Sequence, residues 1–263
     1  MKILWVHNFP PEVQDAGIFM HQMHCYLSKN GMKNLIREAY LSETFVNVDW
    51  KTSACFGNLN ECNINIFVIE SDNIDILNKF SVSGGEYKKQ LRDLFQNHHS
   101  VHVTDNAQDT VRMAKIFFNE NTLSFYNKLD HNYSDTIKNK LNKFRANLIT
   151  KTDPDNYCIC SSFVLGLYNL REPQDLDYIH NETEFTTDTS HNKYEELYPF
   201  SIRDIIYKPE NYFYFNGLKC CTLDVIKRMK IKRNEQPKDI NDISLINTIL
   251  SQVNIHLNNK VFN

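Results

Sequence analysis

The sequence predicts an α+β fold, with a mixed sheet and flanking helices in residues 151–263 and an N-terminal α/β portion in residues 1–150. Two patterns carry this prediction. From Tyr157 to Ile179, a short aromatic run, a longer apolar run and a second short run follow one another, which is the order strand, helix, strand. Further along, two largely apolar runs flank Asn216-Gly217, the dipeptide typical of a two-residue β-hairpin turn.

Composition and charge limit the class of protein. The chain has 263 residues, enough for one large or two small domains, and its net charge of -3 gives no electrostatic reason to expect non-specific nucleic-acid binding. No apolar run reaches the length of a membrane span, and the N-terminus lacks the basic-then-apolar order of a signal peptide. The seven cysteines are odd in number and two pairs, Cys158/Cys160 and Cys220/Cys221, fall in expected strands, which favours reduced, buried thiols over a disulfide framework. No Cys-x-x-Cys pair is present, so we expect no structural zinc site. We therefore expect a cytoplasmic protein.

The first thirty-one residues predict one strand–loop–helix unit. Lys2–Val6 is a strand, residues 7–17 form a loop, and residues 18–27 place apolar side chains at mixed helical spacings. This segment resembles the first βα unit of two-Rossmann-domain glycosyltransferases, down to the turn Asp15-Ala16-Gly17 before the helix. The resemblance implies a glycosyltransferase-related protein. However, no second Rossmann half follows, so a strand and helix packed on the main domain is the alternative.

The remainder of the N-terminal portion predicts alternating helices and strands. The expected strands are 64–69 and 100–104, and the expected helices begin near Asn34 and Asp72, cover 86–96 and 133–148, and follow Asp105 as N-cap. The stretch that begins at Ser100 resembles segments of bacterial proteins encoded beside surface-polysaccharide genes, which implies a role in polysaccharide biosynthesis.

Three histidines near this strand raise the question of a metal cluster. They are His98, His99 and His102, and the last two would face opposite sides of a strand. We therefore favour a solvated or hydrogen-bonded role over metal binding.

The strand–helix–strand segment carries the candidate site. Ser161 and Ser162 open the expected helix, where hydroxyls and backbone N–H groups would face a phosphate. On the strand that follows, the period of two puts Asp175 and Asp177 on one face and Leu176 on the other. Two carboxylates on one strand face suit a Mg²⁺ ion that bridges to phosphates. The alternative is a pair of surface carboxylates on an edge strand.

The same segment resembles the signature of the polymerase-β-type nucleotidyltransferase superfamily, in which a Gly-Ser or similar small pair opens a helix before an Asp-x-Asp strand. Here the pair is Ser161-Ser162, so the usual glycine is missing. The resemblance implies that Asp175 and Asp177 are the catalytic Mg²⁺ ligands, and that Arg171 and the two serines bind the phosphates of the donor.

The C-terminal region adds lysines and a late acidic pair. A helix with Lys227 and Lys230 precedes Lys238-Asp239 and Asp242, an order that resembles the nucleotidyltransferase toxins of abortive-infection systems. The resemblance implies that the three lysines bind phosphate and line the same cleft as the Asp-x-Asp strand. The alternatives are solvent charges for the lysines and helix-start positions for Asp239 and Asp242.

One departure from the superfamily pattern concerns a third carboxylate, which usually lies on a later strand and activates the attacking hydroxyl. The expected strands 212–215 and 218–221 contain no acid, and Asp188, Asp204 and Glu210 are substitutes among which the sequence does not choose. Loss of this base would suit a weak catalyst, a phosphate-binding relic or a relative of the phospho-alcohol transferases that act on cell-surface glycans.

Three functions therefore compete. The first is a Mg²⁺-dependent transferase that moves a nucleotidyl or phospho-alcohol group from a nucleoside triphosphate or nucleotide-activated alcohol to a hydroxyl acceptor, such as a glycan. The second is a non-catalytic nucleotide- or glycan-binding module, and the third is a glycosyltransferase-related protein. The polar stretch 181–197 follows the site and has little periodicity, so a mobile lid and disorder both remain open.

Overall fold

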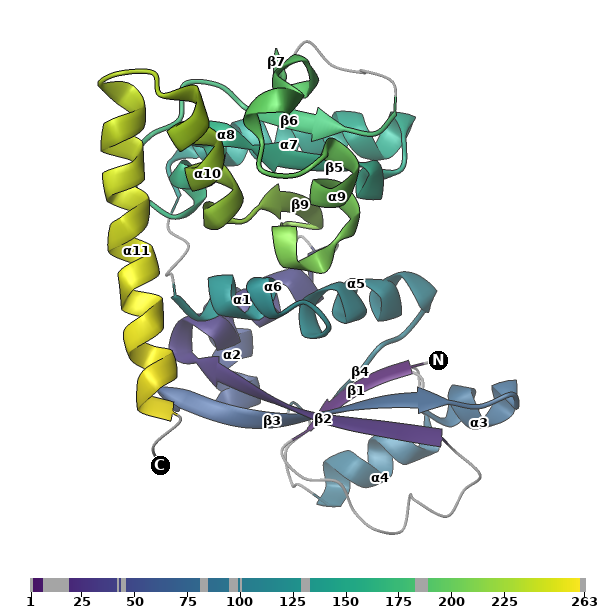
Figure 1. Ribbon diagram of the computed structural model, residues 1–263. Helices are drawn as coiled ribbons and strands as arrows, with labels where there is room; N and C mark the ends of the chain where they lie inside the picture. Colours follow the sequence, from purple (N-terminus) through teal and green to yellow (C-terminus); the bar gives the residue numbers. More distant parts are fainter. Residues whose placement is uncertain are drawn as a thin grey trace. The chain divides into compact units, whose positions relative to one another are not determined.

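The computed structural model describes residues 2–6, 19–41, 43, 46–80, 85–94, 99, 101–128, 133–182 and 189–260. The chain divides into two compact units, unit 1 from Met1 to Asp130 and unit 2 from His131 to Asn263 (Figure 1). The long helix α7 (Asp135–Lys151) belongs to unit 2, so this division falls earlier than residues 150 and 151. Each unit contains its own sheet and helices, which confirms the α+β class.

Unit 1 is built on a four-stranded sheet in the order β2 (Phe19–Ser28), β3 (Glu61–Glu70), β1 (Lys2–Val6), β4 (His102–Val103). Every pair of neighbours in this sheet is antiparallel. The helices of unit 1 are α1 (Lys29–Ala39), α2 (Val48–Phe56), α3 (Ile74–Lys79), α4 (Glu86–Leu94), α5 (Ala107–Phe117) and α6 (Glu120–Lys128). Ile3, Trp5 and Ile66 are among the buried side chains between sheet and helices.

The helix predicted over residues 18–27 is wrong, because Phe19–Ser28 forms strand β2. Cys25 and Leu27 are buried while His24 is exposed and Tyr26 is partly exposed, so the apolar side chains of this segment recur with the period of a strand. Pairing with β3 along its full length bonds the backbone groups on one side of this edge strand. The strand–loop–helix order on which the glycosyltransferase resemblance rested is therefore not formed, and residues 7–17, the loop of that unit, lie outside the described residues.

Other predictions for unit 1 differ only in detail. The helix expected after Asp105 is α5, but its N-cap is Asn106, whose side chain accepts a hydrogen bond from the Asp109 amide. Of the three histidines, His98 lies outside the described residues, His99 contacts Lys51, and the ring of His102 stacks on Trp5.

Unit 2 is built on the predicted mixed sheet, in the order β7 (Thr189–Ser190), β6 (Asp177–His180), β5 (Tyr157–Cys160), β9 (Leu218–Cys221), β8 (Tyr212–Phe215). The central strand β5 is antiparallel to β6 and parallel to β9. Its α-helices are α7, α8 (Ser161–Leu167), α9 (Ile202–Tyr207), α10 (Leu223–Arg233) and α11 (Lys238–Lys260), and its short 3-10 helices are η2 (Pro154–Asn156), η3 (Asn192–Leu197) and η4 (Pro209–Asn211).

The predicted hairpin turn of unit 2 is formed. Asn216 and Gly217 both have positive φ, at 54° and 73°, which is the backbone of the expected two-residue hairpin turn between β8 and β9. Thr222 caps α10 by accepting a hydrogen bond from the amide of Val225. All seven cysteines of the chain are free, and those of β5 and β9 are buried, as predicted.

No helix in the described part of the chain combines the length and the apolar character that crossing a lipid bilayer requires.

Candidate functional site

The site begins at the junction of β5 and α8, where the strand runs directly into the helix. Ser161, the first residue of α8, has a φ of 57°, in the left-handed region that glycine adopts at little cost. This is the position at which the resemblance places a glycine. Ser161 and Ser162 are both buried, so the junction is packed on the sheet.

The register of the sheet brings Asp177 to this junction. Asp177 begins β6 and lies opposite Cys160, the last residue of β5, so it is beside the start of α8. The hydroxyl of Ser161 donates a hydrogen bond to the carboxylate of Asp177, whose side chain is almost fully buried. Two residues that are sixteen positions apart in the sequence therefore form one polar contact.

Asp175 completes the carboxylate pair from outside the strand. β6 was expected to include Asp175, but it begins at Asp177, and Asp175 lies in the bend before it with an exposed side chain. Leu176 between them is buried, as expected for a core position. Burial and then the charge of Asp175 raise the pKa of Asp177 to about 6, against the opposing effects of Ser161 and the charges of Lys238 and Arg233.

His191 is a site residue that the sequence did not reveal. Its Nε2 lies 3.4 Å from Oδ2 of Asp177, and its Nδ1 lies 3.1 Å from the hydroxyl of Tyr198. Since a carboxylate only accepts hydrogen bonds, we assign the ring proton to Nε2. Burial, with the charge of Arg233, lowers the pKa of His191 to about 4, so the ring is neutral at physiological pH.

The position of His191 is fixed by backbone contacts with β6. Its amide donates to the carbonyl of Tyr178 at 2.8 Å. The side chain of the next residue, Asn192, accepts a hydrogen bond from the amide of His180 at 3.0 Å and donates one to its carbonyl at 2.8 Å. Residues 189–197 of the polar stretch are thus ordered as β7 and η3, whereas residues 183–188 lie outside the described residues. A histidine in a polar stretch without periodicity gives no sequence signal for this placement.

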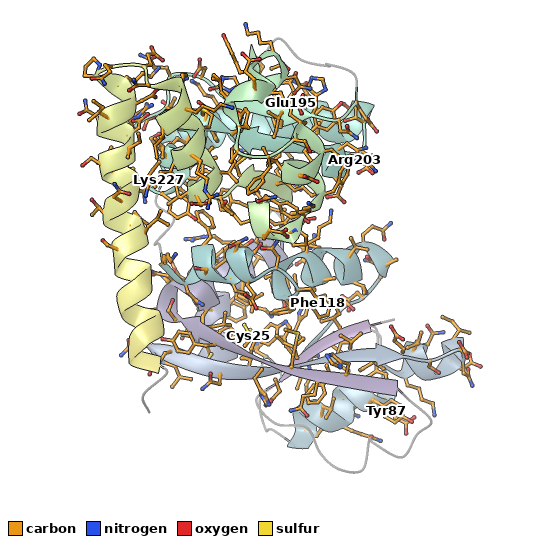
Figure 2. All side chains as sticks on the ribbon, viewed as in Figure 1. Cys25, Tyr87, Phe118, Glu195, Arg203 and Lys227 are labelled. Atoms are coloured by element: carbon orange, nitrogen blue, oxygen red, sulfur yellow. The ribbon has the colours of Figure 1, made fainter. Side chains whose placement is uncertain are left out.

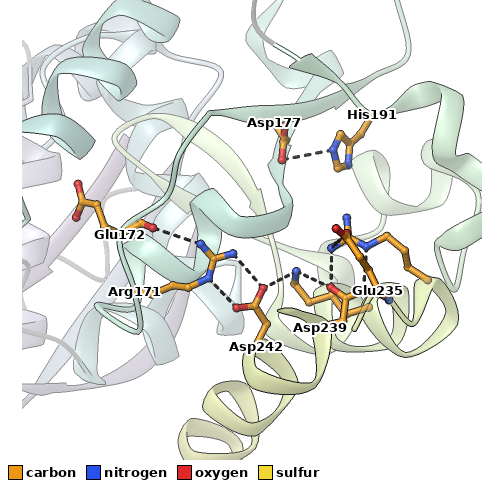
Figure 3. A network of polar contacts seen from close by, with 9 residues as sticks. Arg171, Glu172, Asp177, His191, Glu235, Asp239 and Asp242 are labelled. Carbon is orange, nitrogen blue, oxygen red and sulfur yellow. Dashed lines mark hydrogen bonds and ion pairs between the residues drawn. The ribbon is translucent and has the colours of Figure 1, made fainter. Parts of the chain in front are cut away.

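A network of buried charges lies near this pair (Figure 3). Lys230 on α10 is fully buried, and its Nζ lies 3.3 Å from Asp239 and 2.7 Å from Asp242, both near the start of α11. Arg171 donates two hydrogen bonds to the carboxylate of Asp242, at 2.6 Å from Nε and 3.0 Å from Nη2. Arg233 donates two to the carboxylate of Asp239, at 3.0 Å from Nε and 2.6 Å from Nη2.

The contacts of the network determine the ionisation of Asp239 and Asp242. Burial alone would raise the pKa values of Asp239 and Asp242, but the hydrogen bonds from Arg233 and from Arg171 respectively hold both below the usual range. Both carboxylates are therefore ionised and already paired. Arg171 and Lys230 are paired with these aspartates, and the phosphate-binding role that the resemblance implied for them stays a prediction.

The other expected phosphate-binding lysines differ in their surroundings. Lys238, the first residue of α11, is exposed, and its charge acts on Asp177. Lys227 is half-buried on α10, one turn before Lys230 (Figure 2). Lys230 thus pairs with Asp239 and Asp242, whereas Lys238 is the expected phosphate-binding lysine whose charge acts on Asp177.

The strands that should carry a third carboxylate contain none, as the sequence showed. Lys219 on β9 is buried and donates to the backbone carbonyls of Asp155 at 2.7 Å and Ile206 at 2.8 Å. Of the substitutes, Asp204 pairs with Lys208 at 3.2 Å, Glu210 is exposed on η4, and Asp188 lies outside the described residues.

The donor set fits magnesium better than a transition metal. No group of three or more His, Cys, Asp or Glu side chains within the described ranges is arranged to hold a metal ion. Magnesium is commonly held by one or two carboxylates, with water and substrate phosphates as its remaining ligands. Asp175 and Asp177 fit this coordination by two carboxylates. The carboxylate of Asp177 lies beside the hydroxyl of Ser161, and the side chain of Asp175 is exposed to solvent.

Comparisons with protein-family models, curated proteins and solved structures each found no match.

Proposed function

We propose that unit 2 is a Mg²⁺-dependent transferase of the polymerase-β nucleotidyltransferase type, which moves a nucleotidyl or phospho-alcohol group to a hydroxyl acceptor such as that of a glycan. The observation that carries the proposal is the contact between Ser161 and Asp177. Ser161 has the positive φ of a glycine at the junction of strand and helix, where the resemblance requires a small residue. Its hydroxyl reaches the second carboxylate of the Asp-x-Asp pair.

The site residues have complementary roles in this proposal. Asp175 and Asp177 would hold Mg²⁺, which supplies charge neutralisation for the phosphates of the donor. Ser162 through its hydroxyl, and Ser161 through its backbone N–H while its hydroxyl stays on Asp177, would donate hydrogen bonds to phosphate oxygens. The exposed cation of Lys238 would offset the charge of the phosphate chain.

The buried network would act by positioning. Arg171 lies at the start of the connection that carries Asp175, and it is bound to Asp242 of α11. The same connection is held by Ser134, the N-cap of α7, which donates to Glu172 at 2.6 Å, and by Lys140 on α7, which donates to the carbonyl of Gln174. These anchors fix the approach to β6 from both sides.

A non-catalytic nucleotide-binding module is the second candidate, favoured by the strand that carries no acid. β9 reads Leu-Lys-Cys-Cys and is buried throughout, so it offers no carboxylate to activate an attacking hydroxyl. Such a module would bind the donor with Mg²⁺ but release no product.

Thermal melting tests Mg²⁺-dependent binding, and a product-release assay then separates the transferase from the binding module. The full chain is heated with and without Mg²⁺ in the presence of nucleoside triphosphates and CDP-alcohols, and then tested for pyrophosphate or nucleoside-phosphate release with hydroxyl acceptors. The proposal expects a Mg²⁺-dependent rise in melting temperature that is lost in Asp177→Asn and kept in Asp224→Asn, which removes a partly exposed carboxylate paired with Arg228 on α10. Binding without turnover supports the module, and an unchanged shift in Asp177→Asn refutes the metal site.

A further inference from the structure

Unit 1 contains a group of basic side chains that the proposed function does not use. They come from α2, α4 and α5 and act together on the ring of His102 on β4. We call them the cationic cluster, which consists of Lys51, Lys88, Arg92 and Arg112.

Aromatic rings hold His102 beside the cluster. The ring stacks on Trp5 with centroids 5.4 Å apart, and Trp5 stacks in turn on Phe56 at 5.5 Å. On another side, the hydroxyl of Tyr40 lies 3.5 Å from Nδ1 of His102, and Nζ of Lys51 lies 5.1 Å from the centre of the Tyr40 ring. Burial, followed by the charges of Lys88 and the other members, lowers the pKa of His102 to about 3, so the ring stays neutral at physiological pH.

The cluster has more positive than negative charge among the described residues. Lys88 is almost fully buried and lies 3.5 Å from Asp105, while Arg112 pairs with Asp109. The described hydrogen-bond partner of Lys51 is a histidine ring and not a carboxylate: its Nζ lies 3.2 Å from Nδ1 of His99. Like charges gathered in a partly buried site repel one another, and a bound anion would relieve this repulsion.

Two buried donors point to the same conclusion. Among the described residues, neither Nε of Arg92 nor Nε1 of Trp5 has a hydrogen-bond partner, although both atoms are buried. Buried polar atoms are rarely left without a partner, so each such atom calls for an explanation. An anion at the cluster would accept the bond that Nε of Arg92 lacks, and Trp5 stacks on His102, the ring on which the cluster acts.

We propose that the cationic cluster binds the phosphate group of a small phosphorylated ligand. Two guanidinium groups and two ammonium groups offer more donors than the two oxygens of a carboxylate accept, and a dianionic phosphate matches them better. The buried position of Lys88 limits the ligand to a small molecule. This site needs no metal, because its members are cations, and it does not depend on the function proposed for unit 2.

Tryptophan fluorescence tests the proposal directly, since both tryptophans of the chain lie at the cluster. Trp5 stacks on His102, and Trp50 packs edge-on against His99, the partner of Lys51. In Trp50→Phe, which leaves Trp5 as the only reporter, inorganic phosphate in EDTA at constant ionic strength should change the emission saturably. Chloride at the same ionic strength should not. No saturable change up to tens of millimolar phosphate, or an equal change with chloride, overturns the proposal.

Matched variants in the Trp50→Phe background locate the site. Arg92→Gln and Lys51→Gln should each weaken phosphate binding by about tenfold or more, since each removes a charged hydrogen-bond donor. Lys89→Gln removes the same charge from the exposed face of α4 and should bind as the Trp50→Phe protein does, as should Asp177→Asn in unit 2. Thermal melting identifies a variant that fails to fold, and the other variant then decides. Equal weakening by Lys89→Gln, or none by a folded Arg92→Gln or Lys51→Gln, refutes the assignment.

Discussion

Nε2 of His191 lies 3.4 Å from Oδ2 of Asp177, and the pKa values of these two groups are in the reverse of their ordinary order. Burial raises the pKa of Asp177 to about 6 and lowers that of His191 to about 4. Between these values both groups are neutral, whereas a carboxylate and an imidazole in water would both be charged in this range. At physiological pH the contact is therefore a hydrogen bond that the neutral ring donates to the carboxylate, and a Mg²⁺ ion at Asp177 would not compete with a histidine cation.

The inverted order predicts opposite pH effects on stability for two variants. The folded-state pKa of Asp177 lies above its unfolded value, so its contribution to stability is lost as pH rises from about 4 to 6. That of His191 lies below its unfolded value, so its contribution is lost as pH falls from about 6.5 to 4. Each effect amounts to about 3 kcal/mol, and in the parent they oppose each other.

Relative to the parent, Asp177→Asn should gain stability as pH rises through this range, and His191→Gln should gain stability as pH falls. Urea unfolding in EDTA between pH 4 and 7 measures both differences, with any constant offset assigned to the lost contact. Differences that do not vary with pH, or that vary in the same direction, would show that the two groups do not titrate in this way.

The left-handed backbone of Ser161 predicts an unusual ranking of glycine and alanine. At φ 57° a side chain costs about 1 kcal/mol that glycine avoids, so Ser161→Gly should be more stable than Ser161→Ala by about that amount. Both variants lose the hydroxyl, so their difference reports the backbone alone. At Ser162, within the helix, the order should be reversed, because glycine is the poorer helix former. The same order at both positions would mean that Ser161 is not strained; urea unfolding of the four variants gives the comparison.

The buried ammonium of Lys230 predicts a large loss of stability when it is removed. Lys230→Met leaves Asp239 and Asp242 buried with one arginine each, and breaking a buried network of this kind costs about 3–5 kcal/mol. The control is Lys227→Met, one turn earlier on the same helix and half-buried, for which a change within about 0.5 kcal/mol is expected. Equal losses for the two variants in urea unfolding would show that the ion pairs do not stabilise α10 against α11.

Local patterns in the sequence predicted much of unit 2 because neighbouring residues determine them. The turn at Asn216-Gly217 and the strand–helix–strand order around Ser161 both depend on a few adjacent residues. The same reasoning failed for β2, because Phe19–Ser28 fits either period and only its pairing with β3 selects the strand.

Contacts between distant residues account for what the sequence did not reveal. Lys230 reads as a solvent or phosphate-binding lysine until Asp239, Asp242 and Arg171 are brought around it by the packing of α10, α11 and the end of α8. His191 likewise reaches Asp177 only because β7 pairs with β6.

The forked contact between Arg171 and Asp242 predicts a positioning role that can be separated from charge. Lysine keeps the charge but cannot form both hydrogen bonds, so Arg171→Lys should lose about 1–2 kcal/mol of stability. Because Arg171 anchors the connection that leads to Asp175, the Mg²⁺-dependent melting shift should also shrink, although both carboxylates remain. The control is Arg203→Lys on α9, an exposed arginine, which should keep both properties. A variant at Arg171 that loses stability but keeps the full Mg²⁺ shift would reduce this arginine to a structural role.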